Sequence, residues 1–248
     1  MRLHTLTASL LAATLLIGCG EPKIEENVVK THPNGNKWIV DYYQGNVTNV
    51  VRKTIYFPSG QVRSDQFFKD GEPDSLMVMY DSTGQKLKEA IYNVGKLNGI
   101  EREWYPNGQL KSEATFVDGA PKGTAVTYYE DGSKASEVSY VDGKKEGEAK
   151  KWYSNGQQKS IEPYTAGNLS GVVKEWHKNG NRKKKAEYKD NALHGKIVEY
   201  YENDSKKKEA EYDNGQLHGV KTEYYESGRK RATATYKHGQ EVYAEFFG

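Results

Sequence analysis

The chain has 248 residues, of which 35% are apolar and 28% are charged. Its 36 basic and 34 acidic side chains leave a formal net charge of +2, so the overall charge does not point to nucleic-acid binding. The apolar content is low for a two-layer core, yet 19 Tyr, 6 Phe and 4 Trp are too many aromatic residues for a disordered chain. The composition favours a thin folded body in which aromatic rings supply most of the buried area.

The first residues have the pattern of an export signal. Met1-Arg2 provides a short positive region, and residues 6–17 carry no charge and are mostly apolar. A helix of that length spans about 18 Å, which is less than the roughly 30 Å of a membrane core. We therefore expect residues 1–18 to be a signal peptide rather than a transmembrane helix.

The end of this signal, Leu16-Ile17-Gly18-Cys19, resembles the lipobox of bacterial lipoproteins. The resemblance implies cleavage before Cys19 and lipid attachment to it. Because Gly20 rather than Asp follows, it also implies an exported protein anchored by lipid at the outer membrane of a Gram-negative bacterium. Cys19 is the only cysteine, so no intramolecular disulfide can form, and a chance cysteine in an ordinary signal peptide is the alternative. Residues 19–34 would be the lipidated cysteine and a polar tether.

Beyond the tether, glycine recurs with a period of 24 residues in three series. The first series is Gly60, Gly84, Gly108, Gly132, Gly156, Gly180 and Gly228, with Asp204 in the missing position; the second is Gly71, Gly95, Gly119, Gly143, Gly167, Gly215 and Gly239, with Asn191 substituting; the third is Gly99, Gly123, Gly147, Gly171, Gly195 and Gly219. Such self-similarity indicates a repeat array in which each unit contacts mainly its neighbours. We expect seven units over residues 60–227, a divergent capping unit at 35–59 and a truncated one at 228–248.

Each unit is predicted to be one β-hairpin. Residues 104–110, Trp-Tyr-Pro-Asn-Gly-Gln-Leu, predict a tight turn, because Asn-Gly suits a type I′ turn. Residues 108–116 alternate polar and apolar side chains, 118–123 form a wider turn, and 124–129 are again strand-like. The predicted fold is all-β: an elongated single antiparallel sheet, a meander of repeated hairpins joined by Asn-Gly turns, and twisted or curved.

The turns and strand ends of these units resemble those of a known family. The segments Val94–Gly99, Asp142–Gly147 and Asn214–Gly219, followed by strands that end in Tyr-Tyr-x-x-Gly, resemble the MORN repeat, and more closely its 24-residue bacterial variant. The resemblance covers residues 60–248. Members of this family are often labelled antitoxin components of toxin–antitoxin systems, so the resemblance implies neutralisation of a dedicated toxin as one hypothesis.

Aromatic residues recur at the same period between the glycines. One column, which we call the ring column, contains Trp104, Tyr128, Trp152, Trp176, Tyr200 and Tyr224. A two-residue Asn-Gly turn would place Trp176 opposite Lys183, Tyr200 opposite Lys207 and Tyr224 opposite Arg231. These positions predict a ladder of cation–ring contacts, worth about 0.5–1 kcal/mol each, on the wetter face of the sheet.

The same register makes further predictions about the two faces. It pairs Glu175 with Lys184 and Glu199 with Lys208. It also gathers the small residues Ala90, Ala114, Ala186 and Ala210 with the Tyr92 and Tyr105 columns on the second face, which we expect to be better packed. A one-residue bulge at the turn would exchange the faces.

The ring column and its cations are the candidate binding surface. Basic residues are concentrated beside it at Arg182–Lys185, Lys206–Lys208 and Arg229–Arg231. A protein partner or an envelope component such as a glycan or lipid head group would fit this surface. The alternative is that the rings only stabilise the sheet and that the cations form a solvated edge.

Motifs of catalytic sites are missing from the sequence, which contains no Gly-x-Ser-x-Gly, P-loop or His-Glu-x-x-His. His194 and His218 lie one repeat apart, about 9.5 Å, too far to bind one zinc ion together. We expect no enzyme activity, no cofactor, no metal, no small-molecule substrate and no nucleic acid. Three hypotheses remain: a lipid-anchored surface for a protein or envelope component, an antitoxin or immunity protein, and a binder of envelope glycans or lipid head groups.

Overall fold

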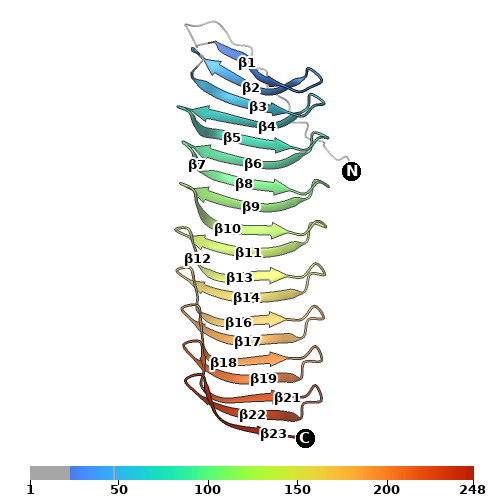
Figure 1. The fold of residues 1–248 in the computed structure, drawn as a ribbon, viewed down its shortest axis with the longest axis vertical. Helices are drawn as coiled ribbons and strands as arrows, with labels where there is room; N and C mark the ends of the chain where they lie inside the picture. The colour runs from blue at the N-terminus through green and yellow to red at the C-terminus, as the bar shows by residue number, and fades with distance from the viewer. Residues whose placement is uncertain (1–22, 47) are drawn as a thin grey trace, which may run out of the picture.

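The computed structural model describes residues 23–46 and 48–248 as one antiparallel sheet (Figure 1). The long strands pair in the order of the sequence, from β1 at one end to β23 at the other, and each two-residue strand pairs with the long strand before it. The predicted all-β meander of hairpins is confirmed. The expected signal peptide, residues 1–18, and Cys19 lie outside the described residues.

The strands of the first part are β1 (Ile24–Thr31), β2 (Lys37–Gln44), β3 (Val50–Tyr56), β4 (Val62–Lys69), β5 (Glu72–Tyr80), β6 (Lys86–Asn93), β7 (Lys96–Leu97), β8 (Gly99–Trp104), β9 (Leu110–Val117), β10 (Ala120–Tyr128), β11 (Lys134–Val141) and β12 (Lys144–Lys145). The second part contains β13 (Gly147–Trp152), β14 (Gln158–Thr165), β15 (Asn168–Leu169), β16 (Gly171–Trp176), β17 (Arg182–Lys189), β18 (Ala192–Tyr200), β19 (Lys206–Asp213), β20 (Gln216–Leu217), β21 (Gly219–Tyr224), β22 (Lys230–Lys237) and β23 (Gln240–Phe246). The two-residue strands β7, β12, β15 and β20 are each separated by one residue from the strand that follows.

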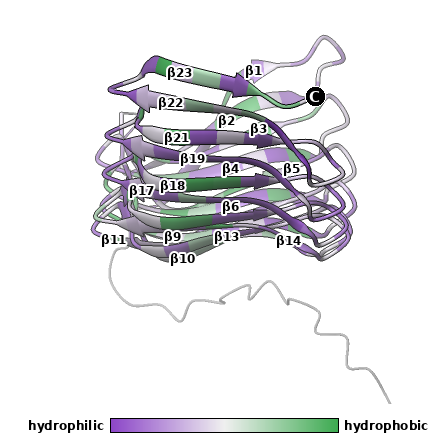
Figure 2. Ribbon diagram, turned by 90° about the horizontal axis from the view of Figure 1, so that it is seen from below, coloured by the Kyte–Doolittle hydropathy of each residue, from purple (hydrophilic) through white to green (hydrophobic). Residues whose placement is uncertain are grey.

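The sheet bows along its length. In the view along the long axis, β1 and β23 lie towards one side, whereas β10, β11 and β13 lie towards the other (Figure 2). The hydropathy colouring in the same figure shows mostly hydrophilic strands with short hydrophobic stretches, as the low apolar content requires. The predicted curvature is therefore present in a sheet that has little hydrophobic interior.

The strand β1 corrects one boundary of the expected organisation. It occupies residues 24–31 and pairs with β2, for example Val28 with Val40. The expected tether, residues 19–34, is therefore wrong for this segment, which adds an edge strand to the sheet. Polar residues in the sequence of β1 suggested a linker, yet an edge strand needs only one neighbour and can be polar on its outer side.

The second glycine series forms the tightest turns of the sheet, where we expected wider ones. Asp118 and Gly119 both have positive φ, 50° and 83°, and Val117 pairs with Ala120 across them. A two-residue loop with positive φ at both positions is a type I′ turn, whose twist matches that of the flanking strands. The N–H of Gly119 donates to the carbonyl of Leu97 at 2.8 Å, which joins this hairpin to the one before it.

The Asn-Gly turns are three-residue loops, so our expectation of a type I′ turn there is wrong. Between Tyr105 and Gln109, only Gly108 has positive φ, 86°. The N–H of Tyr105 donates to the carbonyl of Gln109, and the N–H of Gly108 to that of Tyr105, each at 2.9 Å. This is a type I turn followed by a left-handed glycine.

Asparagine is suited to this turn because of its side chain rather than its tolerance of positive φ. The Oδ1 atom of Asn107 accepts the N–H of Gln109 at 2.9 Å, which closes the turn locally. Its Nδ2 atom donates to the carbonyl of Glu130, in the next turn of the same kind, at 2.8 Å. Asn155 and Asn179 make the equivalent bonds to Lys178 and Glu202. The side chain thus ties neighbouring repeats together along one edge of the sheet.

The longer loop shifts the predicted pairing of the ring column by one residue. Trp176 lies opposite Arg182 and not opposite Lys183. A bulge in the next strand absorbs the extra residue, so that Glu175 pairs with Lys184 as predicted. The predicted pair of Glu199 with Lys208 is also present, with 2.8 Å between Nζ and Oε1.

The same correction applies along the column. Trp104 lies opposite Leu110, Tyr128 opposite Lys134, Trp152 opposite Gln158, Tyr200 opposite Lys206 and Tyr224 opposite Lys230. The expected cross-strand pairs of Tyr200 with Lys207 and of Tyr224 with Arg231 are therefore wrong. Because the bulge restores the register, the two faces themselves are not exchanged.

The better-packed face is the one that we predicted. Ala186, Ile197 and Ala210 are 0%, 3% and 3% exposed, respectively. Tyr188, Leu193, Tyr212 and Leu217 pack against this cluster. Small side chains let the long rings of neighbouring strands close over them, so a single-layer sheet buries residues without a second layer.

Candidate functional site: the ring column and its basic residues

The ring column lies on the face opposite the buried alanines. Side chains alternate between the faces along a strand, and Glu175, next to Trp176, faces the same side as Val173 and Ala186. The rings keep part of their surface exposed, except for Tyr200, which is 9% exposed. The column therefore offers a row of partly accessible rings along the sheet.

Cation–ring contacts are present on this column, but with other cations than those predicted. Lys86 lies 5.4 Å from the ring centre of Trp104, and Lys134 lies 5.6 Å from that of Trp152. Arg182 lies 4.3 Å from the ring centre of Tyr200. Each cation stands at the start of one strand and its ring at the end of the next long strand. The ladder thus links neighbouring Asn-Gly turns along one edge of the sheet rather than the two sides of one such turn.

The three predicted cations are the bulge residues, and the bulge takes them off the ring column. Lys183 forms an ion pair with Glu175 at 3.3 Å. Lys207 lies 5.7 Å from the ring centre of Tyr201. The backbone carbonyl of Arg231 accepts the N–H of Phe247 at 2.9 Å.

A second aromatic column bonds one repeat to the next, a role that sequence reasoning missed. The hydroxyl of Tyr153 donates to the backbone carbonyl of Trp176 at 2.9 Å. The equivalent bonds run from Tyr105 to Tyr128, from Tyr129 to Trp152 and from Tyr201 to Tyr224. His177 replaces tyrosine in this column and keeps the bond, with Nε2 3.1 Å from the carbonyl oxygen of Tyr200. The signal in the sequence for this bonding role is His177 itself, because it replaces tyrosine with another ring that carries a polar group at its end.

Near the C-terminal end, a ring of the column is held by a carboxylate. The hydroxyl of Tyr224 donates to Glu209 at 2.6 Å. Burial and this bond raise the pKa of Tyr224 to about 12. Bonds from Lys206, at 2.7 Å, and from Tyr224 lower the pKa of the Glu209 carboxyl. The charges on this part of the face are therefore held in fixed pairs.

Five of the ten residues of the basic cluster, Arg182, Lys183, Lys184, Lys206 and Lys208, are paired with nearby acids. Arg182 binds Asp204, with Nη2 2.7 Å from Oδ2 and Nε 2.8 Å from Oδ1. These bonds hold the pKa of Asp204 below its usual range. Lys184 lies 3.7 Å from Glu175. The positive field expected from the run of basic residues is thus reduced to about half of them, the side chains that have no acidic partner.

A cleft of about 340 Å³ lies between two rings of the column. Its lining residues are Lys174, Glu175, Trp176, Arg182, Lys184, Lys185 and Tyr200. It is the place where the ring column and the basic cluster meet, and it brings the candidate residues Trp176 and Tyr200 to one concave surface.

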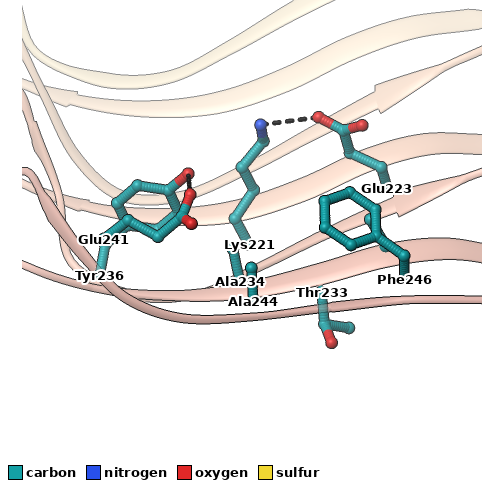
Figure 3. A pocket seen from close by; sticks show the side chains of 9 residues that line it. Lys221, Glu223, Thr233, Ala234, Tyr236, Glu241, Ala244 and Phe246 are labelled. Atoms are coloured by element: carbon teal, nitrogen blue, oxygen red, sulfur yellow. Dashed lines mark hydrogen bonds and ion pairs between the residues drawn. The ribbon is translucent and has the colours of Figure 1, made fainter.

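A smaller cleft of about 120 Å³ lies near the C-terminal end, between β21, β22 and β23 (Figure 3). Within it Lys221 pairs with Glu223 at 2.6 Å, and the hydroxyl of Tyr236 donates to Glu241 at 2.8 Å. Each charged side chain of this cleft thus has a partner inside it. It offers a ligand no free charge, in contrast to the cleft beside Trp176.

The histidines that we considered as metal ligands are separate. His194 Nδ1 lies 3.3 Å from Asp213 Oδ1, whereas the ring centre of His218 lies 5.4 Å from that of His238. In the part of the chain that the structure describes, no group of three or more His, Cys, Asp or Glu side chains is placed to hold a metal ion. Over the same residues, the structure contains no helix with the length and hydropathy needed to span a bilayer.

Comparison with known proteins places the repeats in a family. No curated protein matches the chain. One solved structure that matches is described as "Crystal Structure of TcdB2-TccC3-Cdc42"; it is 11% identical over 87% of this chain and 16% of the other, with a TM-score of 0.20. The chain thus spans about a sixth of the length of that relative, and so low a TM-score supports no argument about fold or function.

The family described as MORN repeat variant matches six consecutive segments, residues 97–118, 121–142, 145–166, 169–190, 193–214 and 217–238. Together these segments cover more than half of the chain. Their starts are 24 residues apart, which is the period of the glycine series, and each begins in the strand after a type I′ turn. The chain therefore belongs to the MORN repeat variant family.

Proposed function

We propose that the chain is a non-enzymatic binding protein that presents the ring column and its neighbouring cations to a component of the cell envelope. The observation that supports this most directly is the row of rings, all partly exposed except Tyr200, that is repeated along an elongated sheet (Figure 1). A row of equal rings offers many similar contacts to an extended partner, and large flat side chains contribute most of the energy at binding surfaces.

We propose further that the protein is held at a membrane through a lipid on Cys19. The lipobox-like end of the predicted signal supports this proposal. The sheet begins with β1 at Ile24, so few residues separate the anchor from the folded body. The N-terminal end of the sheet would then lie near the membrane, and the long axis would carry the ring column away from it.

Capture from envelope extract tests the binding function. Detergent-solubilised full-length protein should retain a partner that the double variant Trp152→Ala, Trp176→Ala does not. Tyr243→Ala is the matched control, because Tyr243 is 59% exposed on the edge strand β23, away from the ring column. Equal capture by the double variant would mean that the rings serve the sheet alone.

Fractionation tests the anchor separately. The parent protein should pellet with membranes, and Cys19→Ser should move it to the soluble fraction without changing the folded sheet. Membrane association that survives Cys19→Ser would contradict lipid attachment at this residue.

A further inference from the structure

One repeat departs from the others in the charge that it places on the ring-column face. The positions equivalent to Lys185, at multiples of one repeat, carry a carboxylate in six cases, Asp41, Asp65, Glu89, Glu113, Glu137 and Glu209, and a neutral residue in two, Ile161 and Thr233. At Lys185 the charge is reversed. Lys185 is the one basic residue of this series between residues 41 and 233, and a position that breaks a local rule is often functional.

In three of these repeats the carboxylate neutralises a lysine three residues before it. Lys86 pairs with Glu89 at 2.7 Å, Lys134 with Glu137 at 2.6 Å and Lys206 with Glu209 at 2.7 Å. In the reversed repeat, the corresponding cation is Arg182, and it pairs instead with Asp204 at 2.7 Å. Asp204 replaces a glycine of the first series, so three coordinated changes leave Lys185 without an acidic partner.

Lys174 lies directly opposite Lys185 on the neighbouring strand. The equivalent residues Arg102 and Glu113 form an ion pair at 2.5 Å. Like charges directly opposite each other destabilise a sheet, and their Cβ atoms are only about 5 Å apart. Both lysines are exposed, and neither has an ion pair anywhere in residues 23–46 and 48–248.

The other groups at this cleft do not supply the missing negative charge. Glu175 lines the cleft, but Lys183 and Lys184 already bind it, at 3.3 and 3.7 Å. Glu187, two residues along the strand from Lys185, lies against Gly195 and does not line the cleft. Two ammonium groups thus face one open concave surface that carries an excess of positive charge.

We propose that this cleft binds a sugar phosphate. The phosphate would lie between Lys174 and Lys185, because a dianion with three acceptor oxygens matches two ammonium donors. The sugar ring would lie against Trp176, which is partly exposed and whose flat face suits the apolar C–H face of a pyranose, whereas the ring of Tyr200 is buried under Arg182 and forms the wall of the cleft. The volume of about 340 Å³ is at the small end of ligand sites and suits one or two sugar units rather than a protein domain. This inference rests on the proposed binding function and names its ligand class.

Saturation-transfer NMR with the full-length protein tests the proposal, with glucose 6-phosphate as the probe. Glucose and inorganic phosphate are the controls, and both should bind at least tenfold more weakly than the probe. The key variant is Lys185→Glu, which restores the acid of the regular repeats opposite Lys174. It should weaken binding of glucose 6-phosphate at least tenfold while keeping the melting temperature of the parent or raising it.

Lys189→Glu is the matched control, since it makes the same charge change on the same strand outside the cleft and should bind as the parent does. Equal binding by Lys185→Glu and the parent, or no preference for the probe over glucose and phosphate, would overturn the proposal. Retention of polyglutamate in place of the probe, lost in Lys185→Glu, would overturn the sugar assignment in favour of an acidic protein. If glucose 6-phosphate does not bind but the parent protein still captures a partner from envelope extract that the double variant Trp152→Ala, Trp176→Ala loses, only the sugar-phosphate inference is wrong. If no partner is captured either, the proposed binding function is wrong as well.

Discussion

Arg182 and Asp204 join two neighbouring repeats through two parallel bonds, from Nε and Nη2 of the guanidinium to the two carboxylate oxygens. Asp204 holds this position at a φ of 66°, in a turn where the equivalent residues are glycine. The pair is exposed, and exposed ion pairs contribute little to stability. Its effect is to hold Arg182 over the ring of Tyr200, with the guanidinium charge paired, at the cleft that the two unpaired lysines also line.

Replacement of Asp204 by glycine should therefore not destabilise the protein. The change relieves a left-handed backbone that glycine adopts without steric cost, and it removes an exposed ion pair and an exposed 3.2 Å bond from the N–H of Arg182 to Oδ1 of Asp204. We expect the melting temperature, followed by circular dichroism, to stay the same or rise slightly. A clear fall would show that the pair is a main link between these repeats.

The third glycine series contains positions of unequal tolerance. Gly99 has a φ of 148°, and a Cβ added there would lie 2.8 Å from the Cβ of Ile91. Gly123 is equivalent in the repeat, has a φ of 72°, and would place its Cβ in open space. Gly99→Ala should cost about 1–3 kcal/mol more in free energy of unfolding than Gly123→Ala, because it adds a steric clash and a backbone conformation that only glycine favours. Urea denaturation of the two variants measures the difference, and equal losses would contradict it.

The hydroxyl bonds between repeats should contribute measurably to stability. Tyr153→Phe removes only the bond to the carbonyl of Trp176 and keeps the ring. We expect a loss of about 0.5–1.5 kcal/mol in free energy of unfolding. Tyr243→Phe is the control, because that ring is exposed on the edge strand, and it should have no effect within error. A loss as large in the control would assign the effect to tyrosine in general.

Alkaline titration should show that Tyr224 is among the last tyrosines to ionise. Its pKa is raised to about 12 by burial and by the bond to Glu209, so the folded state binds the phenol proton more tightly than the unfolded state. The resulting stabilisation is present below about pH 10 and is lost as the pH rises towards 12. The absorbance difference between the parent and Tyr224→Phe isolates this titration. Glu209→Gln should lower the midpoint, and an unchanged midpoint would exclude the carboxylate as a cause.

Acid should weaken the sheet for the opposite reason. Bonds from Lys206 and Tyr224 lower the pKa of Glu209, and a bond from Lys221 lowers that of Glu223. A carboxyl whose pKa is lower in the folded state stabilises the fold above its unfolded value of about 4.3 and loses this effect as the pH falls below it. Urea midpoints should therefore fall between pH 5 and pH 3, and the double variant Glu209→Gln, Glu223→Gln should show a shallower fall. A parallel decline in both proteins would mean that other groups cause the acid sensitivity.

The periodic part of the architecture could be predicted from the sequence, because it depends on local rules repeated many times. Glycine series at 24 residues, strand-like alternation and turn residues indicate hairpins without knowledge of any long-range contact. The packed face followed in the same way, since Ala186 and Ala210 stand at the spacing of their neighbouring rings. The predicted assignment of side chains to the two faces is correct although the predicted length of the Asn-Gly turns is wrong, because a bulge after each turn restores the register.

Only the tertiary structure decided those side-chain contacts that change when the register between two strands shifts by one residue. Whether Trp176 meets Lys183 or Arg182 depends on a loop of two or three residues, and Asn-Gly is compatible with both. The hydroxyl bond from Tyr153 to Trp176 crosses between repeats, so no local pattern predicts it. The opposed lysines at 174 and 185 likewise became visible only once the register was known, since each alone is an ordinary basic residue of a strand. Sequence thus determined the repeat, and backbone register decided which side chains meet.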